Sequence, residues 1–311
     1  MVLRATGINP VTESMMIWIQ QQADERREDY EMARRYYGGD HDTAITDRLK
    51  KFLPPRLAFR DNFMNVVVDA LAERLKVIGF TSEDVDYSEW AWGLWQMNRM
   101  DYTQVVIHTE AVMLGDSYIL CDWDAVKERP RWTHQMPEMI IPHYDEVNRE
   151  VSWVSKKWIQ HPNIGDDPET RLNLYYPDRV EKYVARGGVW TRHQDDEDEA
   201  WPVPWLDKSG EPLGIPIIHF RNRPMGGDFG QSEIINVIPM QDLLNKSLID
   251  LTMILDTLAF PQRYTLNVNH NSSRLEIMPG SVAEFHSEYD GGQVGQWTAA
   301  SVDGPLKAIE S

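Results

Sequence analysis

The chain has 311 residues and a mass of 36.1 kDa, with 42% hydrophobic and 26% charged side chains. This is the composition of a globular protein, and it excludes a disordered or collagen-like chain. The 49 acidic side chains outnumber the 31 basic ones, so the formal net charge is −18. Proteins that grip nucleic-acid phosphates usually carry the opposite balance, so tight non-specific DNA binding is not expected.

The terminal sequence and the cysteine content indicate the cellular setting. The one cysteine, Cys121, has no partner within the chain for a disulfide, which suits a reducing cytoplasm. The first 16 residues lack a basic segment followed by an apolar one, so no signal peptide is predicted. No uncharged apolar run reaches 18 residues, and we therefore expect no membrane association.

The first third of the sequence predicts helices. Asn9-Pro10 is typical of an N-cap and first turn, and the helix that it begins should end at Tyr37, before Gly38-Gly39. The elements expected next are a helix over 62–75, a short strand over 77–80, and helices over 88–100 and 101–114, with Gly115 ending the last.

From Ser117 to about Arg221 the pattern changes to strands separated by Pro and Gly. The β-branched and aromatic runs are Tyr118–Leu120, Val151–Val154, Leu172–Tyr175 and Ile217–Phe220. A helical front end that leads into a mainly antiparallel sheet predicts an α+β fold.

The most regular element is a long helix between Pro239 and Pro261, about 30 Å in length. Its leucines recur at spacings of 4, 3, 4 and 3, which predicts a packing seam made of Leu244, Leu248, Leu251, Leu255 and Leu258. Asp242, Lys246 and Asp250 recur every fourth residue and form a second, charged stripe that should face water. These charges disfavour a membrane span.

Beyond this helix the sequence predicts a small β-rich unit and the start of another helix. The short strands are expected over 263–268, 275–277 and 281–285, and the new helix should begin at Pro305. Only six residues follow Pro305, and a helix that short is not stable alone. We therefore expect the sequence to be a truncated one.

No motif in the sequence indicates catalysis. His41 and its acidic neighbours could bind a metal, but a polar turn is the stronger interpretation because no HExxH spacing accompanies them. The Gly226–Ser232 segment resembles a phosphate loop without its GK[ST], so a turn with Ser232 as N-cap is favoured. His134, His143 and His219 stand alone, and there is no GxSxG. We predict a non-enzyme with no cofactor, no metal and no catalytic residue.

Several segments, taken in order, resemble the portal proteins of tailed double-stranded DNA bacteriophages. Their shared order over about residues 30–265 carries the resemblance, since no one of them is specific. The matching stretches are Tyr36–His41, Asn65–Leu75 with Gly79-Phe80, Trp95–Asp101, His108–Tyr118, Gly214–Asn222, Phe229–Ile234, Asn245-Lys246 and Phe260–Tyr264.

The resemblance implies a division of the chain into the parts of a portal subunit. Its order would be an α/β wing over 1–230, a stem helix over 231–262, a small β-rich clip over 263–304 and the start of a second stem helix over 305–311. Portal proteins of this family continue through further stem, wing and crown helices, so the sequence is expected to end before them.

The resemblance also implies function and partners. Portals form a ring, usually of twelve subunits, at one capsid vertex of the virion, through which DNA is packaged and ejected. Expected partners are the terminase large subunit, head-completion or adaptor proteins, and capsid and scaffold proteins, with assembly in the bacterial host cytoplasm. A channel must pass DNA without holding it. Residues 76–311 carry 37 acidic and 20 basic side chains, and carboxylates prevent a deep binding well for phosphate.

Two other function classes fit parts of the sequence. The 12 tryptophans would suit a carbohydrate- or cell-surface-binding structural module, and His41 with nearby acids would suit a metal-dependent hydrolase. Neither accounts for the regular leucine helix flanked by Pro239 and Pro261. The stripe of Asp242, Lys246 and Asp250 is the candidate channel-facing surface of that helix, and an outward-facing location is the alternative.

Overall fold

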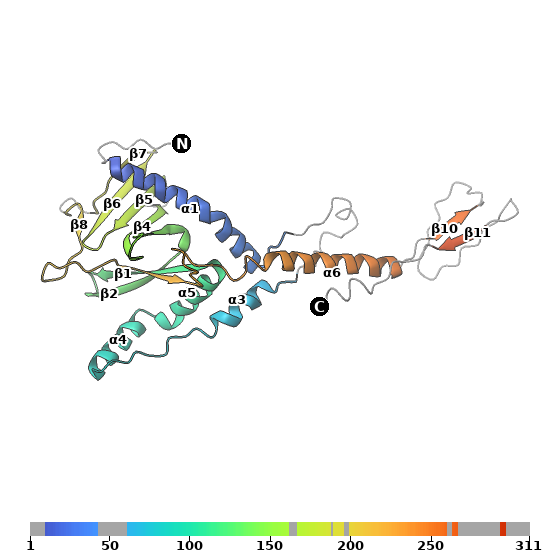
Figure 1. Ribbon diagram of the computed structural model, residues 1–311, viewed down its shortest axis with the longest axis horizontal. Helices are drawn as coiled ribbons and strands as arrows, with labels where there is room; N and C mark the ends of the chain where they lie inside the picture. The colour runs from blue at the N-terminus through green and yellow to red at the C-terminus, as the bar shows by residue number, and fades with distance from the viewer. Residues whose placement is uncertain are drawn as a thin grey trace. The chain divides into compact units, whose positions relative to one another are not determined.

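The computed structural model (Figure 1) describes residues 10–42, 61–161, 167–187, 189–195, 199–259, 263–266 and 293–296. Contacts between Cα atoms divide the chain into two compact units. The first unit is made of Met1–Asp40 and Asn62–Ile238, and the second of His41–Asp61 and Pro239–Ser311.

The first unit begins with the long helix α1 (Pro10–Tyr37), as predicted. Gly39 ends it by adopting a left-handed backbone with φ of +81°, a conformation that costs glycine little. The buried side of α1 carries Ile19, Tyr30, Ala33 and Tyr36. Most of its charged middle lies in water, where exposed ion pairs such as Arg27–Asp24 contribute little to stability, but the Arg26 side chain is only 22% exposed.

Three shorter helices follow: α3 (Met64–Ala72), α4 (Val85–Met97) and α5 (Met100–Leu114). Helix α4 begins three residues before its predicted start because the Asp84 side chain caps it, accepting from the backbone N–H groups of Asp86 and Tyr87. Gly115 ends α5 with φ of +97°, as expected. The strand predicted over 77–80 is wrong, because the Val77 N–H donates to the Gln104 side chain at 2.8 Å and not to a neighbouring strand.

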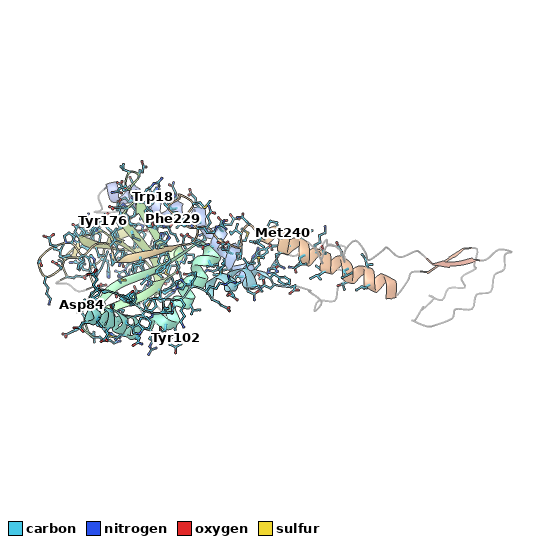
Figure 2. The ribbon with its side chains drawn as sticks, turned by 60° about the horizontal axis from the view of Figure 1, so that its bottom comes forward. Trp18, Asp84, Tyr102, Tyr176, Phe229 and Met240 are labelled. Atoms are coloured by element: carbon cyan, nitrogen blue, oxygen red, sulfur yellow. The ribbon has the colours of Figure 1, made fainter. Side chains whose placement is uncertain are left out.

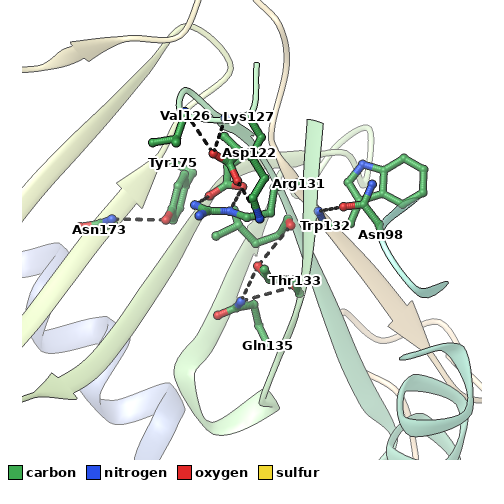
Figure 3. A network of polar contacts seen from close by, with 12 residues as sticks. Asn98, Asp122, Val126, Lys127, Arg131, Trp132, Thr133, Gln135, Asn173 and Tyr175 are labelled. Carbon is green, nitrogen blue, oxygen red and sulfur yellow. Dashed lines mark hydrogen bonds and ion pairs between the residues drawn. The ribbon is translucent and has the colours of Figure 1, made fainter. Parts of the chain in front are cut away.

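Helix α5 packs on a three-stranded antiparallel sheet with the order β2-β1-β9. Its strands are β1 (Asp116–Asp124), β2 (Arg129–Gln135) and β9 (Ile217–Arg221). Figure 3 shows the polar contacts along the β1–β2 hairpin, where Arg131 pairs with Asp122 across the strands. Asn98, just after α4, accepts the Trp132 N–H at 3.0 Å and thereby joins the helices to β2.

A larger antiparallel sheet follows the order β3-β4-β5-β6-β7, with β8 also paired to β6. A short 3₁₀ turn, Pro137–Met139, leads into it. Its strands are β3 (Ile140–Tyr144), β4 (Val151–Gln160), β5 (Glu169–Tyr175), β6 (Arg179–Arg186), β7 (Val189–Arg192) and β8 (Val203–Pro204). Helix α1 lies along this sheet (Figure 1), and Ile19 packs with Trp153, Leu172 and Leu174 in a common core.

The second unit contains the long helix α6 (Ile238–Ala259) and the antiparallel pair β10 (Arg263–Leu266) and β11 (Gln293–Gln296). Ile238, the first residue of α6, still belongs to the first unit. The predicted 263–268 strand is found as β10, and β11 was not predicted. The strands predicted over 275–277 and 281–285 and the helix from Pro305 lie outside the described residues. None of the described helices has the length and apolar character that crossing a bilayer requires.

The observed architecture is a mixed α+β fold, as the sequence predicted. Five α-helices and two antiparallel sheets, together with the β10–β11 pair, make up the described elements. One core, formed by Tyr36, Met64, Val68, Leu114 and Ile234 among others, joins α1, α3, α5 and the segment that leads into α6.

Candidate functional site

The segment that leads into α6 is fixed by a buried carboxylate at the start of β1. Asp116 is fully buried and accepts hydrogen bonds from the Tyr30 hydroxyl at 2.9 Å and the Gly230 backbone N–H at 2.7 Å. The Arg26 guanidinium forms an ion pair with the same carboxylate and lies over the Phe229 ring at 3.8 Å. A buried carboxylate is stable only when paired in this way.

His219 on β9 completes the set of donors around Asp116. Because a carboxylate only accepts, His219 Nε2 must carry the proton that it shares with Asp116 Oδ1 at 2.8 Å. Its Nδ1 then accepts from the Tyr144 hydroxyl at 2.8 Å in the neutral ring. Burial lowers the pKa of His219, an effect that Asp116 only partly opposes. The lone histidine noted in the sequence is thus a neutral, hydrogen-bonded core residue.

Two glycines allow the backbone to close at this point. Gly115 O accepts the Asn222 N–H at 2.8 Å, and Asn222 O accepts the Gln231 N–H at 2.7 Å. A Cβ atom on Gly230 would lie 1.9 Å from Gly115 O, a distance that no side chain can occupy. The close approach explains Gly230, and a left-handed backbone with φ of +83° explains Gly226.

Ser232, predicted as an N-cap, caps a turn that precedes α6 and not the helix itself, which begins at Ile238. Its Oγ accepts from the backbone N–H groups of Ile234 and Ile235 at 3.2 and 3.4 Å. It also donates to Met113 O, the carbonyl of a residue near the end of α5. The turn over 233–237 therefore precedes α6, which begins at Ile238 with Pro239 in its first turn.

A second buried carboxylate, Glu110, ties α1 to α5. Arg34 donates to Glu110 at 2.8 Å and to Glu138 at 2.8 Å, and Ser117 and His134 also contact Glu110. His134 is therefore a partner of a structural carboxylate. His143, the third isolated histidine, stacks on Trp153 at 4.9 Å.

The candidate residues of α6 lie at different depths in the second unit. Its buried face is formed by Gln241, Asn245 and Ile249, which recur every fourth residue. Among the predicted seam residues, Leu244, Leu248 and Leu251 are half-buried, Leu255 is exposed and Leu258 lies outside the described side chains. Of the charged stripe, Asp242 and Asp250 are half-buried and Lys246 is exposed.

The buried face of α6 holds the two ends of the His41–Asp61 segment. Asn245 Oδ1 accepts the Asp61 backbone N–H at 3.1 Å, so the Asn245 amide nitrogen must face His41 Nδ1, at 2.9 Å. Gln241 donates to Asp61 O at 2.7 Å, one turn earlier on the helix. His41 therefore serves the packing of α6. The residues with this role, Gln241 and Asn245, were not predicted.

The other candidate chemistry is accounted for by packing. Burial raises the pKa of the Cys121 thiol to about 11, so the group stays a protonated, unreactive thiol. Trp95, Trp153 and Trp190 are buried in cores and do not form one carbohydrate-binding surface. In the parts of the chain that the structure describes, no three His, Cys, Asp or Glu side chains gather as a metal ion would require.

Comparison with known proteins gives the family. Residues 18–284 match the model of the family described as "Phage portal protein, SPP1 Gp6-like". The chain belongs to this family. Portal proteins of this family are structural and not enzymes, in agreement with the sequence prediction and against a hydrolase.

Two curated portal proteins are similar to this chain, from Mycobacterium phages D29 and L5. Each is 24% identical to it over 217 residues, which is 66% of this chain and 41% of the relative. The chain thus spans about two fifths of the length of the portal proteins that it matches. The His41–Asn245 contact joins two of the stretches on which the portal resemblance was based.

Proposed function

We propose that the chain is a subunit of the portal ring at one capsid vertex of a virion, a conduit for DNA packaging and ejection. The observation that carries the proposal is the match to the portal family over residues 18–284. A ring of about twelve subunits, assembled in the host cytoplasm, follows from the resemblance stated above. Terminase, head-completion or adaptor proteins, and capsid and scaffold proteins are the proposed partners.

The proposed parts of the subunit follow the order of the elements. Residues 1–230 would form the wing, 231–262 the stem helix, 263–304 the clip and 305–311 the start of a second stem helix. The 22-residue helix α6 between the sheets and the β10–β11 pair supports this division. Helices α1, α3, α4 and α5 with the two sheets supply the mixed α/β wing.

The proposed stem has two functional surfaces. Leu244, Leu248, Leu251, Leu255 and Leu258 would pack against neighbouring subunits or the second stem helix. Asp242, Lys246 and Asp250 would face the channel, where carboxylates keep phosphate from binding tightly. The half-buried state of Leu248 and Leu251 within one chain leaves them surface that a neighbour could cover.

Leu251→Asp tests the packing surface. A charge placed in an apolar seam costs several kcal/mol, so we expect smaller species in place of rings in sedimentation velocity. Leu251→Met, which conserves volume and apolar character, is the matched control and should assemble as the wild type does. Rings of normal size from Leu251→Asp would contradict the stem proposal.

Asp242→Lys with Asp250→Lys tests the channel surface. If the stripe faces the lumen, rings should still assemble but retain DNA through new phosphate contacts that salt weakens. The matched control is Asp242→Asn with Asp250→Asn, which removes both charges without adding cations. Mutant rings that package DNA normally and retain none at low salt would place the stripe on another surface.

A further inference from the structure

Helix α4 lies at the outside of the first unit (Figure 1) and leaves two large aromatic side chains exposed. Its inner side packs through Leu94 and Trp95, which are buried. On its outer side Tyr87 and Trp90 are 57% and 56% exposed, and the centroids of their rings lie 5.5 Å apart. Met97 is exposed as well, two turns beyond Trp90 on the same side of the helix. Tyrosine and tryptophan are among the residue types that supply most of the binding energy at protein interfaces.

Gly93 opens a gap between Trp90 and Met97. It follows Trp90 by three residues and precedes Met97 by four, so all three share one stripe of the helix. Apart from the helix backbone around it, a Cβ atom on Gly93 would meet nothing within 4 Å in the part of the chain that the structure describes. Glycine inside a helix is less stable than alanine, and proteins use it where another backbone approaches closely. Gly93 therefore leaves room for a second chain to approach α4.

The charge around this side of α4 indicates the chemistry of its partner. Residues 77–98 contain four carboxylates and no lysine or arginine. Asp84 caps the helix, and Figure 2 shows it at the lower edge of the first unit. Glu83, Asp86 and Glu89 are exposed and form no ion pair with any residue that the structure describes. These carboxylates repel nucleic acid and other acidic surfaces, whereas lysine and arginine side chains are attracted to them.

We call this surface the α4 outer face, and its members are Asp86, Tyr87, Glu89, Trp90, Gly93 and Met97. We propose that it binds a segment of another protein that carries lysine or arginine beside apolar side chains. The two rings cover the apolar side chains and stack on guanidinium groups, and the carboxylates pair with cations at the rim. The gap at Gly93 admits the backbone of the partner. The proposal concerns a single chain and does not depend on the ring proposed above.

Two synthetic peptides test the chemistry of the partner. Both have about 18 residues with leucine at helical spacing, and the remaining positions are lysine in one peptide and glutamate in the other. By isothermal titration calorimetry with the full chain, we expect the lysine peptide to bind at least about 10-fold more tightly than the glutamate peptide. Glu89→Lys should weaken binding of the lysine peptide by about 10-fold. Glu146→Lys, at an exposed glutamate in the turn between β3 and β4, is the matched control and should leave it unchanged.

Gly93→Ala separates binding from folding. The thermal unfolding midpoint should rise, because alanine favours the helix, whereas the affinity for the lysine peptide should fall by about 10-fold, because the methyl group fills the gap. Trp90→Ala removes an exposed ring, so its affinity should fall by about 30-fold or more at a nearly unchanged midpoint.

Three outcomes would overturn the proposal. The first is equal affinity of the wild type, Trp90→Ala and Glu89→Lys for the lysine peptide, which would show attraction by net charge alone. The second is binding of the glutamate peptide as tight as that of the lysine peptide. The third is self-association of the chain in sedimentation velocity that Trp90→Ala abolishes, which would identify a second copy as the molecule that covers the α4 outer face.

Discussion

Asp116 accepts the backbone N–H of Gly230 at 2.7 Å, although 114 positions separate the two residues in the sequence. The contact joins the first residue of β1 to the segment that leads into α6. Since Arg26 and Tyr30 of α1 and His219 of β9 bind the same carboxylate, one side chain positions three parts of the first unit.

The charge of Asp116 should therefore matter more than that of any surface aspartate. Asp116→Asn leaves the Arg26 guanidinium without its anion and should lower the free energy of unfolding by about 3–5 kcal/mol. Asp122→Asn is the matched control on the same strand, because it breaks the partly exposed pair with Arg131 and should cost about 1 kcal/mol or less. Urea unfolding measures both, and equal losses would contradict the role given to Asp116.

Acid should lower the free energy of unfolding, because protonation of His219 is less favourable in the folded state. Burial first, and the charges of Arg221 and Arg26, hold the pKa of His219 below the value of about 6.5 that it has when unfolded, and Asp116 opposes them only in part. The unfolded state then binds a proton that the folded state resists. The contribution of His219 to the free energy of unfolding should be constant above about pH 6.5. It should fall as the pH drops from there towards the pKa of the folded state.

His219→Gln should flatten this dependence between about pH 7.5 and 5.5 in urea unfolding series. Some slope should remain, because burial also lowers the pKa of His108. Val147→Ala, at a non-titrating residue that is 93% exposed, is the control and should keep the wild-type slope. The same slope in His219→Gln as in the wild type would be evidence against the neutral histidine.

The close contact between Gly115 and Gly230 predicts that a glycine-to-alanine substitution will be far more destabilising here than at an open position. Gly230→Ala would bring a Cβ atom to 1.9 Å from Gly115 O and 2.7 Å from Asn222 O, and backbone atoms on both sides cannot yield cheaply. We expect a loss of about 4 kcal/mol or more, or no folded protein. Gly93→Ala is the control: it lies inside α4 with open space around it and should gain roughly 0.5–1 kcal/mol. The thermal unfolding midpoints of the two variants measure this difference, and a similar midpoint for both would contradict the close contact at Gly230.

The attachment of the His41–Asp61 segment to α6 can be tested separately in the second unit. Asn245→Leu conserves the size of the side chain but removes its hydrogen bonds to His41 and to the Asp61 N–H, at a cost of about 1–3 kcal/mol. Ser247→Ala, which removes one exposed bond to Leu243 O, should cost about 0.5 kcal/mol or less. Hydrogen exchange of the Asp61 amide should accelerate only in Asn245→Leu.

The elements that the sequence predicted well are those with local causes. The ends of α1 at Tyr37 and of α5 at Leu114 follow from Gly39 and Gly115, which adopt positive φ, and α1 includes Pro10, as predicted. The segment Val77–Phe80 has β-branched residues, but its Val77 N–H donates to the Gln104 side chain and not to a neighbouring strand. A strand depends on pairing with distant residues, which local propensity does not report.

The candidate site was harder to predict for the same reason. The periodic leucines and charges of α6 can be read from one segment, whereas burial of Gln241 and Asn245 depends on His41 and Asp61, some 180 to 204 positions away. A glutamine and an asparagine four residues apart in an apolar helix were the available signal. The sequence signal for Asp116 was weaker, because none of the groups that donate to its carboxylate is near it in the sequence.

The meeting of Gly115 and Gly230 has a consequence for how the chain is divided. Residues 116–229 leave and return at almost one point, and they contain both sheets of the first unit. The core of Tyr36, Met64, Val68, Leu114 and Ile234 draws none of its buried members from this stretch. The sheets are thus an insertion between α5 and the approach to α6. Because α1, α4 and α5 all pack against or bond to these strands, we expect an exchange or circular permutation of the insertion to be tolerated only where those contacts are kept.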